Sequence, residues 1–274
     1  MVRSVTGRYE KPPADAGASE LHGRFNMDMS DCIVPDWRAP RNVKALFTTR
    51  NGGTGHSRYA SFNLGDHVGD DPMTVKQNRA VLRRHLPNEP CWLKQVHQTT
   101  VFDMDAHDCS TPPAADAVFS RQPGNVCAVL VADCLPVLLC DRAGTMVAAI
   151  HAGWRGMTAG VIERTVAAMS PAATQLIAWL GPAIGPNHFE VGNEVRRAFI
   201  TNDERAAAAF VSHDERSGKW FADLFLLARL RLLKAGVNEV YGGDLCTFSD
   251  PSRFFSYRRD GVTGRMAGLI WLAD

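Results

Sequence analysis

The chain has 274 residues, and 30 Lys and Arg side chains balance 29 Asp and Glu side chains to a formal net charge of +1 at pH 7. This balance excludes the basic excess that a nucleic-acid-binding surface requires, and no apolar run approaches the roughly 20 residues needed to span a bilayer. The length suits one large domain or two small ones, with enough residues for a sizeable core.

The N-terminal region and the cysteines indicate the compartment. The first 20 residues lack the apolar segment of a signal peptide, and seven cysteines without regular spacing do not suggest a secreted disulfide scaffold. We therefore expect a cytoplasmic protein with reduced cysteines. Residues 1–30 are rich in Pro, Gly, Ala and charge, which predicts a mobile extension ahead of a catalytic domain at residues 31–274.

The first predicted strand of the core covers residues 43–48 and leads into a long polar loop. A polar loop of about 20 residues inside a compact domain is usually functional or disordered. The loop ends at Asp71 and Pro72, an N-cap residue followed by proline at the first helical position. A helix is therefore predicted to begin there.

The next polar landmark is His97. Residues 91–96 and 100–102 predict a strand or a strand pair on either side of it, and residues 103–113 form an acidic, polar insertion. His97 thus lies between two extended segments.

Three apolar runs follow, at residues 126–132, 137–140 and 146–150. They predict one strand buried on both faces, then a β-hairpin, then a glycine-rich turn into a helix. Cys134 follows the first run, and His151 follows the third. Because ligands meet the chain at strand ends in sheets that helices cover, these two residues are candidates for a site.

The remaining third of the chain predicts further helices and strands. One helix follows His151, and another begins at Asp223 with Leu226, Leu230 and Leu233 on its buried stripe. Strands are predicted at residues 175–180, 237–241 and 267–272. The expected fold class is α/β, with a mixed β-sheet covered by helices in a single-domain, three-layer-like architecture.

His97, Cys134 and His151 form the main candidate constellation. Two imidazoles and a thiolate make a three-ligand zinc site with a fourth position open for catalysis, where zinc activates water or polarises a substrate group. The spacing is not that of a compact zinc finger. From the residues alone, an alternative is that Cys134 is a small buried hydrophobe and the histidines are satisfied polar side chains.

Several motifs resemble one family, the laccase-domain or multicopper polyphenol oxidase family, also called peptidoglycan editing factor and purine nucleoside phosphorylase-like. They are KQVHQTTV (94–101), ADCLPVLLCD (132–141), HAGWRG (151–156) and FFSYRRDGVTGR (254–265), and the resemblance covers roughly residues 34–272. It implies a mixed α/β fold with catalytic zinc held by His97, Cys134 and His151. It also implies phosphorolysis of inosine, guanosine, adenosine and methylthioadenosine, with adenosine deamination.

Such a reaction has two small-molecule partners, a nucleoside and phosphate. We expect Arg50 and Arg155 to bind the phosphate, because Arg155 lies at a predicted helix start where backbone N–H groups favour anions. A surface or ion-paired role is the alternative for Arg155, and Arg258 is a weaker substitute with a structural role.

Asp133 is the candidate proton shuttle and substrate-binding carboxylate beside Cys134. Zinc deaminases place a Glu near their first ligand, whereas here Gln98 follows His97. The alternative for Asp133 is a buried, hydrogen-bonding carboxylate.

The family name also suggests copper, which competes well for nitrogen and sulfur ligands. Copper is therefore possible at the three-ligand site, with laccase-like polyphenol oxidation as a by-product. A trinuclear copper cluster is not expected, because the nine histidines include no His-x-His pair.

Two other functions fit the same residues. One is a hydrolase that edits peptidoglycan precursors, with Cys134 as the nucleophile and His151 as its base. The other is a non-enzymatic module that binds a nucleotide or a wall precursor in the same cleft. Nothing in the sequence indicates the oligomeric state, and neither nucleic acid nor membrane is expected as a partner.

Overall fold

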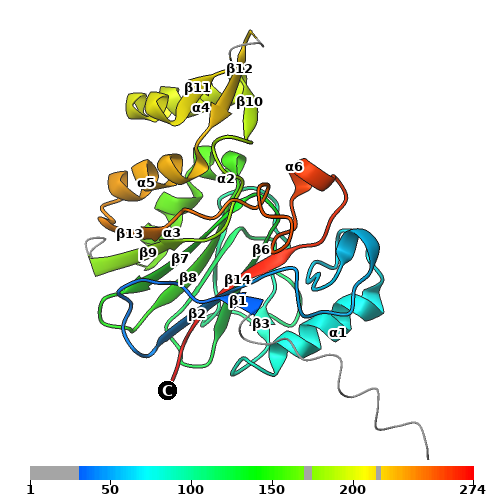
Figure 1. Ribbon diagram of the computed structural model, residues 1–274. Helices are drawn as coiled ribbons and strands as arrows, with labels where there is room; N and C mark the ends of the chain where they lie inside the picture. Colours follow the sequence, from blue (N-terminus) through cyan, green and yellow to red (C-terminus); the bar gives the residue numbers. More distant parts are fainter. Residues whose placement is uncertain (1–30, 170–174, 214–216) are drawn as a thin grey trace, which may run out of the picture.

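A computed structural model describes residues 31–169, 175–213 and 217–274. The mobile extension expected at residues 1–30 lies outside these ranges. The α/β class with mixed sheets is confirmed, and the strands divide among three sheets (Figure 1). None of the helices in the described residues has the length and apolar composition needed to cross a membrane.

The five-stranded sheet contains both ends of the described chain. In order across the sheet, its strands are β1 (Cys32–Ile33), β2 (Val43–Thr48), β14 (Met266–Leu272), β6 (Val126–Val131) and β3 (Pro90–Cys91). β14 runs antiparallel to both β2 and β6, so the C-terminal strand joins the first strands to the central one. The strands expected near residues 43–48, 126–132 and 267–272 are confirmed.

The six-stranded sheet contains the predicted hairpin. In order, its strands are β13 (Glu239–Gly242), β9 (Leu176–Leu180), β7 (Leu135–Asp141), β8 (Val147–Ala152), β5 (Ala117–Ser120) and β4 (Val101–Asp103). β7 and β8 pair antiparallel, and every residue of both strands is buried. A hairpin with no exposed face must be covered on both sides.

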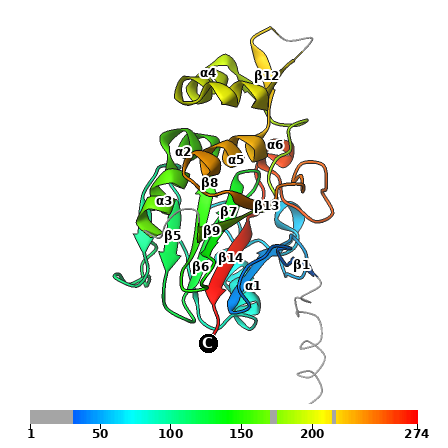
Figure 2. The same ribbon diagram turned by 90° about the vertical axis from the view of Figure 1, so that its left-hand side faces the viewer.

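The two large sheets stack face to face, with helices outside them. Val137 and Leu139 of β7 pack among residues of the helices, whereas Leu138 and Cys140 pack among residues of the five-stranded sheet. This alternation is the period-two pattern of a strand between two layers. The sequence predicts one mixed sheet covered by helices. The structure instead has two stacked sheets with helices on both outer faces (Figure 2).

The helices are α1 (Pro72–Arg83), α2 (Trp154–Ala159), α3 (Val161–Met169), α4 (Asn193–Asn202), α5 (Leu224–Lys234) and α6 (Tyr257–Asp260). The predicted N-caps are confirmed: Asp71 accepts a hydrogen bond from the Thr74 backbone N–H at 2.9 Å, and Asp223 accepts one from that of Leu226 at 3.0 Å. Each cap satisfies an N–H group that has no partner inside its helix.

The stripe predicted for α5 is wrong. The helix buries Leu224, Leu227 and Ala228, while Leu233 is 50% exposed. Leucines occur all round this helix, so the sequence offers more than one apolar stripe, and the contacts with α3 and the 3-10 helix at Glu204–Ala209 decide which is buried.

A small third sheet projects beyond the two large ones. It consists of β10 (Glu190–Gly192), β12 (Lys219–Ala222) and β11 (Phe210–Ser212), and it packs with α4 beyond α5 (Figures 1 and 2). Phe189 directly precedes β10. Its side chain packs in the core that the six-stranded sheet forms with the helices.

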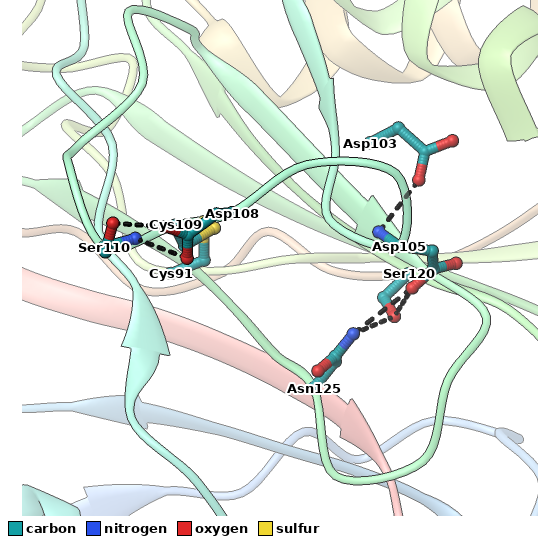
Figure 3. Close-up of a disulfide and its surroundings, with 8 residues drawn as sticks. All are labelled: Cys91, Asp103, Asp105, Asp108, Cys109, Ser110, Ser120 and Asn125. Atoms are coloured by element: carbon teal, nitrogen blue, oxygen red, sulfur yellow. Dashed lines mark hydrogen bonds between the residues drawn. A yellow bond between two sulfur atoms is a disulfide. The ribbon is translucent and has the colours of Figure 1, made fainter.

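One cysteine pair departs from the expectation of reduced cysteines. Cys91 of β3 and Cys109 of the acidic insertion form a disulfide, with Cα atoms 5.5 Å apart (Figure 3). The sequence carries no signal for this pair, because the two residues meet only when the insertion folds back onto the five-stranded sheet. The other five cysteines are not disulfide-bonded.

Removing the α5 cap tests the local rule on which the helix predictions rest. The change Asp223→Ala should lower the free energy of unfolding by about 1 kcal/mol, because the Leu226 N–H group loses its partner. Urea unfolding followed by circular dichroism measures this. The exposed Asp36→Ala change, which removes no cap, should stay within about 0.5 kcal/mol of wild type, and an equal loss in both variants would contradict the assignment.

Candidate metal centre

The β7–β8 hairpin brings two of the three predicted ligands together. Cys134 immediately precedes β7, and His151 lies near the end of β8 with Pro136 as its cross-strand partner. Antiparallel pairing therefore places the start of one strand beside the end of the other. The two residues meet at a strand end, as the apolar runs indicate.

His97 reaches the same point from a different direction. It lies in the segment between β3 and β4, with a positive φ of 59° that few residues other than glycine adopt. The ligand atoms of His97, Cys134 and His151 all lie within 4.8 Å of one another, and the two imidazole centroids are 4.8 Å apart. The structure thus assembles all three predicted residues.

Asp116 joins these segments, and it is not among the residues predicted from the sequence. The side chain is fully buried just before β5. Its Oδ1 atom accepts from the His97 backbone N–H at 2.9 Å and lies 2.8 Å from His151 Nδ1, and its Oδ2 accepts from the Gln98 N–H at 2.8 Å. One carboxylate therefore holds both histidine-bearing segments.

These contacts also set charge and tautomer. Burial by itself raises the pKa of Asp116, but the hydrogen bonds from His151 and the backbone outweigh burial and hold that pKa below its usual range. The ionised carboxylate accepts a hydrogen bond from the Nδ1–H of His151, so Nε2 is the nitrogen available for a metal.

The surroundings of Cys134 favour the thiolate. Burial raises the pKa of its thiol. The charges and hydrogen bonds of His151 and His97 outweigh burial and lower this pKa to about 6. Burial lowers the pKa of His151, and the Cys134 thiolate and Asp116 raise it to about 9. The thiolate is the form of cysteine that binds metals.

The first glycine of the HAGWRG motif has a packing reason. A Cβ atom at Gly153 would lie 3.0 Å from the sulfur of Cys134 and 3.2 Å from Cδ2 of His97. A larger residue would therefore displace two of the three ligands.

Asp133 lies beside the site with its carboxylate engaged in structure. It accepts hydrogen bonds from the hydroxyls of Thr247 and Ser256, at 2.6 and 3.0 Å, and from the backbone N–H of Arg258 at 2.6 Å. Its φ of 85° is in the left-handed region. Asp133 therefore fastens the loop that precedes α6 to the chain next to Cys134, which agrees with the alternative of a buried, hydrogen-bonding carboxylate.

The three ligands lie in a cavity of about 480 Å³. Its apolar lining includes Trp154, Ile184, Phe189, Leu224 and Tyr257, and its cationic lining includes Arg155, Arg258 and Arg265. Among the described residues that line it, Asp133 is the single carboxylate. The cavity thus combines aromatic surface with positive charge.

The arginines fall into two groups. Arg155 is exposed, lines the cavity, and stacks on Trp154 with its guanidinium carbon 4.4 Å from the ring centroid. Arg50 is not brought to the cavity. Its Nε and Nη1 atoms donate to the carbonyl oxygens of Ala60 and Pro251, at 2.8 and 3.0 Å, so this side chain fastens two loops together.

Arg265 and Arg258 border the cavity from the C-terminal loop. Arg265 donates to the carbonyls of Thr263 and Gly264, and Arg258 donates to that of Glu190 at 2.9 Å. Arg258 is predicted from the sequence only as a weaker substitute, and Arg265 is not among the predicted residues. The signal for Arg265 was its place in the last motif, since nothing in its spacing points to the cavity.

The fold and the site together define an α/β protein with a preformed His–Cys–His centre in an aromatic, cationic cavity. The chain belongs to the multi-copper polyphenol oxidoreductase laccase family, whose family model matches residues 44–273. The family expected from the motifs is therefore confirmed.

Relatives and solved structures agree with this assignment. The purine nucleoside phosphorylase YfiH of Escherichia coli is 51% identical over 246 residues, which cover 89% of this chain and all of the relative. A purine nucleoside phosphorylase of Pseudomonas aeruginosa is 50% identical over 90% of this chain and all of its own length. The crystal structure of NMB0706 from Neisseria meningitidis is 50% identical and superposes with a TM-score of 0.85, over 89% of this chain and all of that one.

The change Asp116→Asn should weaken metal binding, with zinc as the probe ion, by about 10- to 100-fold, because the amide NH2 cannot accept from the Gln98 N–H as Oδ2 does and the neutral amide holds the His151 Nδ1–H less strongly. Competition with a chromogenic chelator measures the dissociation constant. Asp141→Asn is the matched control: it alters a buried, hydrogen-bonded carboxylate at the opposite end of β7. Equal zinc affinity in the Asp116 variant and in wild type would show that the carboxylate does not support the centre.

Proposed function

We propose that this protein is a zinc-dependent purine nucleoside phosphorylase that cleaves inosine, guanosine, adenosine and methylthioadenosine, with adenosine deaminase activity. The observation that carries the proposal is the assembled His97–Cys134–His151 centre in a cationic, aromatic cavity. The name of the Escherichia coli relative, aligned over its whole length at 51% identity, supports the same activity.

The donor set fits zinc. One thiolate and two imidazoles are typical zinc ligands, and three protein ligands leave the fourth position that catalytic sites keep open. When bound, the ion supplies a Lewis acid and lowers the pKa of a coordinated water to about 7. His97, Cys134 and His151 would hold it, with Asp116 orienting His151 from behind.

Copper fits the same three ligands, but a laccase mechanism finds less support. In the part of the chain that the structure describes, this centre is the single cluster of three or more potential metal ligands. A trinuclear copper cluster needs many more histidine ligands than a single metal site, usually in His-x-His pairs. The nine histidines of this chain form no such pair. Copper at the three-ligand centre would give weak polyphenol oxidation at most.

The side chains around the centre suit a nucleoside and phosphate. In phosphorolysis, a phosphate oxygen bonds to C1′ of the sugar while the bond from C1′ to the purine nitrogen breaks. Arg155 and Arg258 supply positive charge for the phosphate, and the faces of Trp154 and Tyr257 suit stacking of a purine. Fixing the phosphate beside C1′ removes the entropy cost of bringing the two reactants together.

A second function rests on the Cys134–His151 pair. Without a metal, the lowered pKa of Cys134 and the adjacent imidazole resemble the activated nucleophile of a cysteine hydrolase, which would act on peptidoglycan precursors. The two proposals differ in whether the sulfur is shielded by a metal during turnover.

Cys134→Ala separates these functions. We expect wild type to hold one zinc per chain and to release hypoxanthine from inosine only when phosphate is present, and we expect the variant to lose the zinc and at least 100-fold of the activity. Metal analysis and a coupled hypoxanthine assay measure both quantities. Cys32→Ser in β1, away from the cavity, should keep both. Inactivation by iodoacetamide with zinc fully retained would favour the hydrolase instead.

Arg155 can be tested separately. Arg155→Gln should raise KM for phosphate about tenfold and leave KM for inosine nearly unchanged, because a charge-assisted hydrogen bond to the anion is lost. Arg164→Gln on α3, also exposed, is the matched control. If KM for phosphate stayed at its wild-type value, Arg155 would be a surface arginine stacked on Trp154.

A further inference from the structure

The disulfide between Cys91 and Cys109 closes a stretch of chain that contains one metal ligand. The two cysteines are 18 residues apart, and His97 lies between them. Cys134 and His151 are supported by the β7–β8 hairpin, whereas His97 lies outside any strand and is the exposed member of the three. Its position therefore depends on the attachments of this stretch, which are Asp116 at His97 and Gln98 and the disulfide at the start of the stretch.

Residues 92–100 cross from one large sheet to the other. Cys91 ends β3 in the five-stranded sheet, and Val101 begins β4 at the edge of the six-stranded sheet. The crossing segment is held against the chain that follows the insertion: the Lys94 N–H donates to the Pro113 carbonyl at 2.9 Å, and the Ala115 N–H donates to the Lys94 carbonyl at 3.3 Å. The end of the insertion is thus attached to Lys94, in the same crossing segment as His97.

The acidic insertion is fixed at its start by Asp105. Its carboxylate accepts from the Ser120 hydroxyl at 2.5 Å, the Arg121 backbone N–H at 2.7 Å and the Asn125 amide at 3.2 Å. Figure 3 shows this cluster on one part of the loop and the disulfide on another.

The middle of the insertion has no comparable hydrogen bonds to the body of the protein. Within residues 106–112 of the described structure, the hydrogen bonds run inside the turn, from Ser110 to Asp108 (Figure 3). His107 makes a ring contact with Phe102, at 5.7 Å between centroids. The covalent bond from Cys109 to Cys91 is therefore the main attachment of this part to the sheet.

We infer that the Cys91–Cys109 disulfide is a redox-sensitive fastening that sets the affinity of the His97–Cys134–His151 centre for its metal. Oxidation fixes the middle of the insertion to the start of the crossing segment. Reduction frees the insertion and leaves the crossing segment attached through Asp116, Gln95 and the Lys94 backbone. The inference rests on the metal centre of the proposed function. A segment with fewer attachments samples more conformations, and ordering it when the metal binds lowers the affinity.

The chemistry is thiol–disulfide exchange with a dithiol reductant. Cys109 is partly exposed and Cys91 is fully buried, so the reductant's thiolate attacks the Cys109 sulfur and Cys91 leaves as a thiolate. The second thiol then attacks the mixed disulfide and frees Cys109. Two protein thiols and one reductant disulfide result, with two electrons passed to the protein. Disulfides in reducing compartments are mostly of this reversible kind.

The effect works in both directions. If reduction weakens metal binding tenfold, metal binding must disfavour reduction by the same factor. For this two-electron couple a tenfold change corresponds to about 30 mV, so zinc should lower the midpoint potential of the disulfide by that amount.

The test uses the full chain with zinc as the ligand. Protein equilibrated with glutathione disulfide should show five free thiols after denaturation, and protein treated with a phosphine reductant should show all seven. Chelator competition should give a zinc dissociation constant about tenfold higher in the reduced protein, near the lower end of the range for losing support around a ligand.

Two variants complete the design. Cys109→Ser should have the reduced protein's zinc affinity whether or not reductant is present, while Cys32→Ser should keep the full tenfold response. If Cys109→Ser does not fold, reduced wild type supplies the same comparison.

The outcomes separate this inference from the proposed function. Seven free thiols after oxidation, or equal zinc affinity in both redox states, overturns the inference and leaves the metal centre standing. Failure of both redox states to bind zinc overturns the centre and the inference together.

Discussion

The architecture of the site depends on one buried carboxylate. Burying an ionised carboxylate is costly unless hydrogen bonds replace its water, and Asp116 meets this condition with backbone N–H groups and the His151 imidazole. Those same bonds fix the two histidines relative to each other. The cost of burying the charge and the order of the site therefore have one origin, and the centre is assembled by contacts that need no metal.

Part of this site could be predicted from local pattern alone. Each of the apolar runs in the β7–β8 hairpin borders a polar ligand, so Cys134 and His151 meet wherever the hairpin forms. His97 could be assigned through the family motif, because its approach depends on a crossing between two sheets. Asp116 was missed although it carries a signal: a single carboxylate stands in a run of small and apolar residues that the fold buries.

The rest required tertiary information. Continuous apolar runs show that strands are buried on both faces, but they do not show which strands are neighbours, so the division into two stacked sheets was not predictable. Arg50 has the guanidinium donors that bind anions, yet these donors bond to the carbonyl oxygens of Ala60 and Pro251. The Cys91–Cys109 pair likewise exists only because the insertion returns to the five-stranded sheet.

The central claim is that two imidazoles and one thiolate bind a single zinc ion. X-ray absorption at the zinc edge of the zinc-loaded protein tests it most directly. The account predicts one sulfur at about 2.3 Å and nitrogen or oxygen ligands at about 2.0–2.1 Å, with imidazole scattering from two histidines. A spectrum with oxygen and nitrogen neighbours but no sulfur would contradict it, since Cys134 would then lie outside the coordination sphere.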